Sequence, residues 1–173
     1  MSNNCSANER SGMTNVARKT GSINHLRLTV TDIGRAELFY DPLLAFLGYR
    51  LVERSSTRLA WAGWAAHGSL HWLIVSAVSD EYRNARHHRY APGFHHLAFN
   101  ADSREEVDRF HELLLRQHAS VVGAPKEYSY EPGYYAVFFA DPDGLKLELV
   151  HVPSRSSQDY WQAFALRGHP LPI

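Results

Sequence analysis

Residues 138–150 read FFADPDGLKLELV, an apolar segment followed by a tight turn and a second apolar segment. At the turn, Pro142 fixes φ at the second position and Gly144 accepts the positive φ that the return strand requires. The stretch therefore predicts a β-hairpin. Side chains along its second strand alternate between two faces. Leu145, Leu147 and Leu149 form an apolar face, and Lys146, Glu148 and Val150 form a mixed face.

Glu148 places a carboxylate in the middle of that second strand. A carboxylate there is costly in free energy unless it is solvated, paired or bound to a metal. A solvated outward face is the commonest of these arrangements. Spacing alone therefore leaves both a structural and a functional interpretation of Glu148 open.

The composition is that of a compact globular protein. With 173 residues, 45% of them apolar, the chain suits one domain or two small similar modules that share a core. Lys plus Arg equals Asp plus Glu at 18 each, so no overall charge favours nucleic acid or an anionic membrane. Cys5 is the only cysteine, and neither a signal peptide nor an apolar run of the ~20 residues that a membrane span needs is visible. We expect a cytoplasmic protein that acts on a small molecule, with no nucleic acid and no membrane as partner.

Hydrophobic periodicity and turn signals give the order of elements. Residues 1–21 are polar and predict a disordered leader. Residues 22–78 predict a strand, a helix and three strands, with the strands at 23–30, 49–53, 58–64 and 70–77. Asp32 supplies the N-cap of the helix, which ends at Gly48. Pro42 lies inside the helical pattern and predicts a kink or a break.

The same pattern starts again after a polar linker loop at 79–93. Residues 94–152 predict a strand, a helix capped by Ser103 with Glu106 as its capping-box partner, and three more strands. The expected strands are 94–101, 120–122, 134–140 and 145–152. Residues 153–173 are an aromatic C-terminal extension, for which we expect a short helix packed on the body or on another subunit.

An internal repeat relates the two halves. His25 and His96 are 71 residues apart (96 − 25), and Phe39 and Phe110 are also 71 residues apart (110 − 39). Strand and helix therefore keep the same register in both halves. The sequence predicts two βαβββ modules of the α+β class.

The repeat places His25 and His96 at equivalent points of equivalent strands, on the face opposite the helix-packing residues. Glu148 also faces away from the leucines of its strand. In a sheet that curves around a cavity, these three side chains can converge. Two imidazoles and a carboxylate are a common ligand set for Fe, Mn, Ni or Zn as divalent ions, with positions left open for substrate. Coincidence explains three such residues poorly, so we predict a divalent metal site at His25, His96 and Glu148.

Three segments carry a resemblance to a known family: INHL at 23–26, FHHLAF at 94–99 and DPDGLKLE at 141–148. Over about residues 22–152 the chain resembles the vicinal oxygen chelate superfamily. That superfamily includes glyoxalase I, bleomycin-resistance proteins, fosfomycin-resistance thiol transferases and extradiol dioxygenases. The resemblance implies two modules that form a curved, partly open mixed sheet. It also implies that His25, His96 and Glu148 are the metal ligands of a lyase, a transferase or a dioxygenase.

Two departures from the family pattern narrow the reaction. Glyoxalase-I-like members use a fourth ligand on the last strand of the first module, and counting from the preceding turn gives Trp72, whose indole cannot ligate. His71 takes its place only if the register slips by one residue. Extradiol dioxygenases carry a tyrosine where this chain has Phe138. A site with three ligands, like that of the thiol transferases, remains open.

Several side chains share strand faces or nearby loops with the proposed ligands and are candidates for a substrate pocket. Polar members of this set can orient an anionic or carbonyl substrate, and aromatic members can form its walls. The set is Arg27, Trp72, Asn100, Tyr130 and Tyr134.

Two functions from different classes follow from these observations. The first is a metal-dependent enzyme, in which a small oxygenated molecule chelates the cation through vicinal oxygens and the cation stabilises an enolate or oxyanion. The second is a metal-free protein that binds an aromatic drug in a dimer groove, as bleomycin-resistance proteins do. Those binders lack the ligand trio, which favours the enzyme. We expect a homodimer, because the resemblance implies one and a small monomer would expose the aromatic C-terminal tail.

Overall fold

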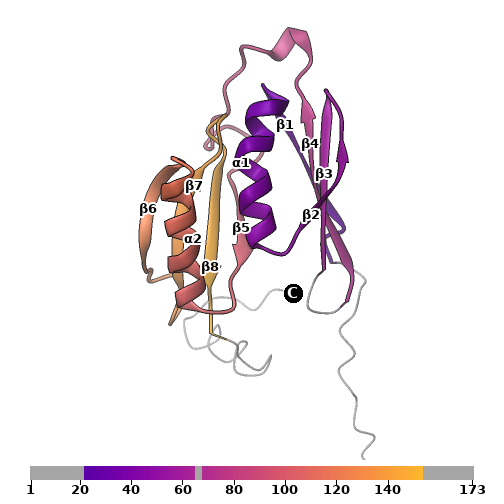
Figure 1. The fold of residues 1–173 in the computed structure, drawn as a ribbon. Helices are drawn as coiled ribbons and strands as arrows, with labels where there is room; N and C mark the ends of the chain where they lie inside the picture. The colour runs from indigo at the N-terminus through magenta and orange to yellow at the C-terminus, as the bar shows by residue number, and fades with distance from the viewer. Residues whose placement is uncertain (1–21, 65–67, 154–173) are drawn as a thin grey trace, which may run out of the picture.

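The computed structural model describes residues 22–64 and 68–153, which form two βαβββ modules (Figure 1). The first module consists of β1 (His25–Val30), α1 (Ile33–Phe46), β2 (Arg50–Arg54), β3 (Arg58–Trp64) and β4 (Leu70–Ala77). The second consists of β5 (His96–Asn100), α2 (Arg104–Arg116), β6 (Ser120–Glu127), β7 (Tyr135–Ala140) and β8 (Lys146–His151). A 3-10 helix, η1 (Asp80–Tyr82), lies in the linker. The predicted leader at 1–21, and the predicted extension from residue 154 onward, lie outside the described residues.

Each module forms its own four-stranded mixed sheet. The strand orders are β1-β4-β3-β2 and β5-β8-β7-β6. In each sheet the first strand of the module runs parallel to the last, and the remaining neighbours are antiparallel. The predicted α+β fold of two βαβββ modules is therefore confirmed. The two sheets are open, and within the described residues no strand pairing joins one sheet to the other.

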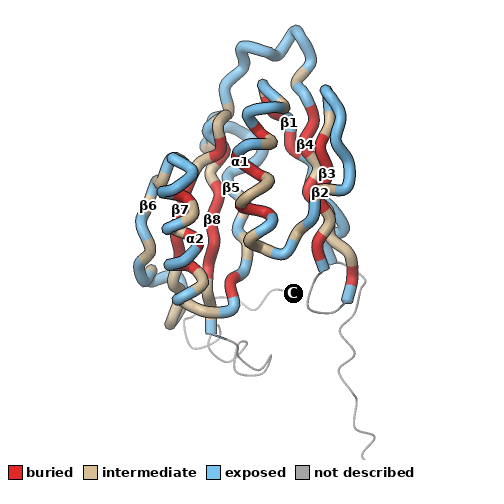
Figure 2. The backbone as a smooth tube through the Cα atoms, in the orientation of Figure 1, coloured by how far each residue is buried: buried red, intermediate tan, exposed pale blue. Residues whose placement is uncertain are grey.

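A shared apolar core lies between the two sheets. In Figure 1, α1 lies between the sheets and α2 covers one face of the second sheet. Phe46 of α1 contacts Phe110 of α2, with ring centroids 5.3 Å apart. The ring centroids of Phe39 of α1 and Phe139 of β7 are 6.3 Å apart. Figure 2 shows that buried positions concentrate on the central strands of both sheets and on the inner sides of the helices. The opposite face of each sheet consequently points away from this core.

Both helices begin where the sequence places a side-chain cap. The Asp32 carboxylate accepts a hydrogen bond from the amide of Arg35 at 2.8 Å. The Ser103 hydroxyl accepts one from the amide of Glu106 at 3.2 Å, and the Glu106 carboxylate reaches back to an amide at the helix entrance. These contacts satisfy amides that have no partner inside the helix, which fixes both helix starts.

The first helix is continuous through Pro42, so the predicted break did not occur. Proline removes one helical hydrogen bond and leaves the carbonyl four residues earlier without its donor. That residue is Leu38, whose side chain is 77% exposed, so water reaches this side of the helix. No described helix is long and apolar enough to cross a membrane.

The strand β6 extends to Glu127, further than the predicted strand at 120–122. It is an edge strand, so Pro125 can be accommodated on the side that has no pairing partner. Register shifts around Gly123 interrupt its pairing with β7. Glycine and proline obscured the alternation from which a strand is predicted.

The Asp-Pro-Asp-Gly turn ties the second module to the first. Asp143 accepts hydrogen bonds from the amide and the hydroxyl of Thr31, at 2.7 and 2.5 Å, and it pairs with Arg35 at 2.7 Å. The buried Asp141 accepts a hydrogen bond from the Tyr40 hydroxyl at 2.8 Å. The hairpin from which the fold was predicted therefore also fixes how the modules are oriented.

Candidate functional site

The outward face of the second sheet carries two of the three predicted ligands, His96 and Glu148. Because β5, β8 and β7 are in register, side chains on this face form rows across the strands. In one row Glu148 lies between Ala98 of β5 and Phe138 of β7. In the neighbouring row Lys146 lies beside His96. The strand pairing thus places a histidine and a carboxylate on adjacent strands of one face.

Glu148 is almost completely buried, with 1% of its side chain exposed. The Tyr134 hydroxyl donates to Oε1 of Glu148 at 2.5 Å, and Nε2 of His96 lies 3.4 Å from Oε2. Burial raises the pKa of the Glu148 carboxyl, although the Tyr134 hydrogen bond and the charge of Lys146 oppose that effect. Burial also lowers the pKa of His96, and the nearby Lys146 and His95 lower it further. These effects favour the neutral imidazole of His96, which keeps a lone pair on one of its two ring nitrogens.

His95 holds the ring of His96. Their Nδ1 atoms are 2.7 Å apart, so one imidazole donates a hydrogen bond and the other accepts it. The two rings meet edge to face with centroids 4.9 Å apart, and Tyr90 of the linker packs on His95 at 5.6 Å. Since Nδ1 of His96 is engaged in this way, its Nε2 is the atom presented to Glu148.

An aromatic loop, residues 128–134, covers Glu148. The amide of Tyr128 donates to the carbonyl of Tyr134 at 2.9 Å, which closes the loop. The rings of Tyr128 and Tyr130 stack, and the Tyr134 ring is nearly perpendicular to both. Gly123 of β6 leaves room for this cluster, because a Cβ there would lie 3.1 Å from the Tyr128 hydroxyl. Burial and the hydrogen bond to Glu148 raise the pKa of Tyr134, so its hydroxyl remains a donor at neutral pH.

His25, the third predicted ligand, lies on the first sheet. It is exposed, and its Nδ1 is 2.9 Å from the amide oxygen of Asn24. Arg27 follows on the same face and donates from Nε to the Ser76 hydroxyl at 2.9 Å. Within residues 22–64 and 68–153 of one chain, no three His, Cys, Asp or Glu side chains cluster closely enough to hold a metal ion. The structure therefore brings two predicted ligands together and leaves His25 apart from them.

The strand register corrects one predicted equivalence between the modules. Trp72 is the partner of His25, as Lys146 is the partner of His96. The position equivalent to Glu148 is thus two residues further along β4, at Ile74, and not at Trp72. Counting from the preceding turn misplaced the equivalent position, because the last strands of the two modules start at different points. The strand β4 begins two residues before Trp72, the partner of His25, whereas β8 begins at Lys146, the partner of His96. Isoleucine cannot ligate either, so this position supplies no fourth ligand.

The remaining predicted pocket residues divide between the two sheets. Tyr134 contacts Glu148 directly, Tyr130 belongs to the aromatic loop, and Asn100 is aligned with Val150 beyond Glu148. Arg27 and Trp72 lie on the first sheet with His25. Sequence analysis did not single out two residues of the site, His95 and Lys146. For Lys146 a signal existed, because alternation places it on the face of Glu148.

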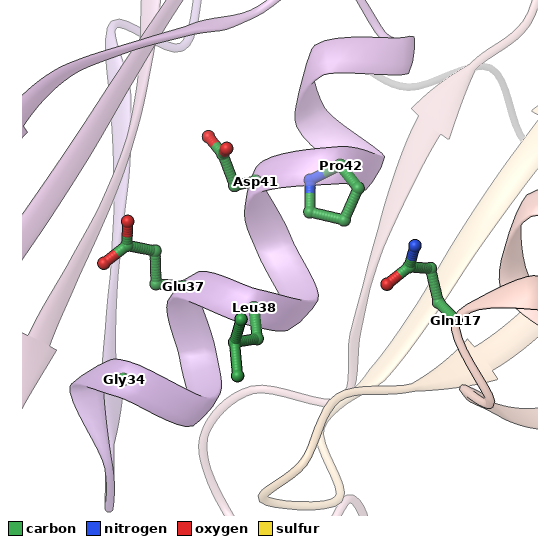
Figure 3. A pocket seen from close by; sticks show the side chains of 6 residues that line it. All are labelled: Gly34, Glu37, Leu38, Asp41, Pro42 and Gln117. Atoms are coloured by element: carbon green, nitrogen blue, oxygen red, sulfur yellow. The ribbon is translucent and has the colours of Figure 1, made fainter.

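A hollow of about 600 Å³ lies away from this site, beside α1 and near the C-terminal end of α2 (Figure 3). It is lined by Gly34, Glu37, Leu38, Asp41, Pro42 and Gln117. Its two carboxylates have structural partners, because Asp41 accepts from the Trp61 indole at 2.8 Å and Glu37 pairs with Arg54. Both carboxylates of the hollow are therefore engaged, and the predicted ligands His96 and Glu148 lie elsewhere.

Comparison with protein families agrees with this geometry. The model of the Glyoxalase/Bleomycin resistance protein/Dioxygenase superfamily matches residues 22–149, the span of both modules. The chain belongs to this superfamily. The resemblance that the sequence motifs indicated is thereby confirmed, together with the fold that it implied.

Individual relatives in this superfamily have different functions. The chain is 30% identical over 129 residues to YqjT of Bacillus subtilis, an uncharacterised protein, covering 74% of this chain and 97% of YqjT. It is 28% identical to the metallothiol transferase FosB of Lysinibacillus sphaericus, covering 82% of this chain and 89% of FosB. A solved glyoxalase-type structure from Bacillus halodurans matches with a TM-score of 0.65 and 29% identity, covering 77% of this chain and 97% of the other.

Proposed function

We propose that this chain is a cytoplasmic, metal-dependent enzyme of the glyoxalase type that acts on a small oxygenated molecule. The observation that carries the proposal is the approach of Nε2 of His96 to within 3.4 Å of the buried Glu148 carboxylate. The similarity to a metallothiol transferase supports it. The metal is Fe, Mn, Ni or Zn as a divalent ion, which all accept imidazole and carboxylate ligands.

The donor set on the second sheet fits such an ion. A buried carboxylate whose pKa is raised by burial is stabilised in its ionised form by a cation. The Nε2 of His96 and the Oε2 of Glu148 face one another, so both can donate to one ion. The Tyr134 hydroxyl donates to Oε1 of Glu148, so Oε2 is the oxygen left to bind a metal ion. Two protein ligands are fewer than such sites use, so a third must come from elsewhere.

A second copy of the chain can supply His25. Both sheets pack on the same core, so their outward faces point in different directions and His25 cannot meet His96 within one chain. In a symmetric dimer, the outward face of the first sheet of each protomer covers the outward face of the second sheet of its partner. That pairing brings His25 of one protomer to His96 and Glu148 of the other. We therefore propose a homodimer with two shared sites.

The bound cation would polarise an oxygen of the substrate and stabilise negative charge that develops on it. The protein residues prepare the site for that chemistry. His95 orients the His96 ring, and the Tyr134 hydroxyl holds Glu148 in one rotamer. The loop 128–134 keeps water away from the carboxylate, which strengthens electrostatic interactions there. Arg27 and Trp72, on the face with His25, can contact the substrate from the other protomer.

Elemental analysis of protein purified without added metal tests the proposal directly. We expect about one transition metal ion per chain in the wild type and a large loss in His25→Ala and in His96→Ala. The control is His111→Ala, a histidine on α2 that lies outside the site. Metal-free wild-type protein, or equal loss in the control, would contradict the proposal.

Mixed dimers test whether the site is shared. A heterodimer of a His25→Ala chain and a Glu148→Gln chain, purified with two different tags, has one site with both changes and one site with neither. We expect it to bind about half the metal of the wild type, whereas each homodimeric variant binds almost none. A site contained within one chain predicts no recovery at all, because every chain then lacks one ligand.

Catechol ring cleavage is expected to be slow or absent. Phe138 stands beside Glu148 on β7 and cannot donate the hydrogen bond that a tyrosine at this position would supply. Oxygen uptake by the metal-loaded enzyme with a panel of catechols measures this. Rapid uptake would overturn the expectation and identify the chain as a dioxygenase. Together with the missing fourth ligand of glyoxalase-I-like lyases, this expectation favours a transferase among the reactions of the superfamily.

A metal-free drug-binding protein is the alternative, and one observation favours it. Without any metal, Glu148 already has a hydrogen-bond donor in Tyr134, and burial raises its pKa toward the neutral form. In that case the aromatic loop would form the wall of a binding groove. Wild-type protein that contains no metal and takes none up from solution would make this alternative the better account.

A further inference from the structure

Lys146 occupies a defined place at the candidate site. It is aligned with His96 on the outward face of the second sheet and lies two residues before Glu148 on the same strand. Its ammonium lies 3.8 Å from the centroid of the Phe138 ring, so the side chain extends along the sheet toward β7. A cation over an aromatic face is held there electrostatically. Lys146 is thus positioned beside the proposed ligands instead of extending freely into water.

The charge of Lys146 is not neutralised by a carboxylate in contact. None of the ion pairs among the described residues involves Lys146. The nearest acid on its strand face is Glu148, whose oxygens are engaged by Tyr134 and face His96. The acid on the covering loop, Glu131, lies close enough to Tyr134 to influence its pKa. A positive group therefore remains at the edge of the site.

We propose that Lys146 binds an anionic group of the substrate, a carboxylate or a phosphate-type group that lies next to the oxygens presented to the metal. This inference rests on the proposed function, because that function places a divalent cation beside the ammonium. Two like charges so close repel each other, and an anion between them removes the repulsion. A neutral substrate would leave the repulsion in place. Lys146 therefore selects an anionic substrate over its neutral analogue.

Phe138 contributes to this selection. Its ring holds the ammonium on one side, so less conformational freedom is lost when the anion binds.

Binding of glycolate and of its neutral analogue glycolamide tests the proposal. Both probes carry vicinal oxygens, and only glycolate carries a charge. Titration calorimetry compares wild type, Lys146→Met and Lys146→Arg, each with and without bound metal, and inorganic phosphate serves as a second anion. The matched control is Lys126→Met, because Lys126 also lies over an aromatic ring, that of Tyr128, but on the far strand of the sheet.

We expect Lys146→Met to weaken glycolate and phosphate binding roughly ten- to a hundredfold, as loss of a charge-assisted contact does. Glycolamide binding, metal content and melting temperature should stay as in the wild type, and Lys146→Arg should keep most of the affinity. Equal losses in Lys146→Met and Lys126→Met, or no saturable binding of either anion by the wild type, would overturn the proposal. Wild-type protein that contains no metal but binds anions through Lys146 would refute the proposed metal enzyme and retain the anion subsite.

Discussion

Replacing Glu148 with glutamine is expected to reduce the affinity for a divalent cation by at least roughly a hundredfold. A neutral amide is a poorer ligand than a carboxylate, and the proposed site would lose one of its three protein ligands. The fold should persist, because the amide oxygen can still accept the hydrogen bond from Tyr134. A neutral group is also less costly to bury than a carboxylate. We expect the melting temperature to stay the same or to rise slightly.

Metal stoichiometry and thermal melting, measured on the same samples, decide this prediction. The matched control is Glu112→Gln, because the Glu112 side chain on α2 is 68% exposed and forms only a long surface contact with Arg116. A purely structural role for Glu148 predicts the reverse pattern, with full metal content and a lower melting temperature. Full metal stoichiometry in Glu148→Gln would therefore make the glutamate structural and would contradict its role as a metal ligand.

The elements of the fold could be predicted from sequence because their signals are local. The turn from Asp141 to Gly144 adopts the backbone that its residues favour, with φ of +87° at the glycine. Asp32 and Ser103 cap the two helices through contacts with residues only three positions away. The 71-residue repeat then gave the second module from the first. Each of these inferences uses neighbours in the chain, where sequence distance and spatial distance agree.

The arrangement of the two modules could not be predicted in the same way. It depends on contacts between residues far apart in sequence, such as Phe46 with Phe110 and Thr31 with Asp143. Those contacts direct the outward faces of the two sheets away from each other. His25 therefore does not meet His96 within one chain, although both occupy the equivalent positions that the repeat predicted. The repeat predicts which residues occupy equivalent positions in the two modules, whereas tertiary packing decides whether those residues come close together.

The register of β4 against β1 was also beyond the turn signals, because it depends on how the two strands pair. Trp72 and Ile74 lie on the same face of β4, so alternation could not distinguish which one is equivalent to Glu148. The strand pairing of β4 with β1 decided it. The role of Tyr134 was equally hidden, because its position over Glu148 depends on how the loop 128–134 folds back. His96 and Glu148 could be predicted from the sequence as candidate ligands, whereas their contacts with His95 and Tyr134 required the structure.

Replacing Asp141 with alanine is expected to cost about 3–5 kcal/mol of the free energy of unfolding. Its Oδ2 accepts from the Tyr40 hydroxyl at 2.8 Å, and its Oδ1 accepts from the amides of Asp143 and Leu145 at 2.9 and 2.8 Å. Alanine would leave these donors without a partner in a buried place, which costs far more than the loss of a surface contact. A domain of this size has a total stability of about 5–15 kcal/mol, so the loss is a large fraction of it.

Urea denaturation of Asp141→Ala and of Tyr40→Phe measures the two halves of this contact. We expect Tyr40→Phe to cost about 1.5–3 kcal/mol, since it removes one hydrogen bond to a charged group. The control is Asp80→Ala, because the Asp80 side chain is 90% exposed and pairs only with Arg83 at the surface. A loss in Asp141→Ala no larger than in this control would show that the turn does not hold the modules together.

The pH dependence of stability separates the role of Tyr40 from that of the other tyrosines. Burial, and next the neighbouring Asp141, raise the pKa of Tyr40 well above its ordinary value. The stability that the protonated Tyr40 hydroxyl contributes to the folded protein is therefore fully present below the pKa of an unfolded tyrosine, about 10. This stability is lost as the pH rises above that value. We expect the wild type to lose more stability than Tyr40→Phe between about pH 9 and pH 11, so that the difference between them narrows. Parallel curves for the two proteins across this range would mean that the Tyr40 hydroxyl does not bond to a buried carboxylate.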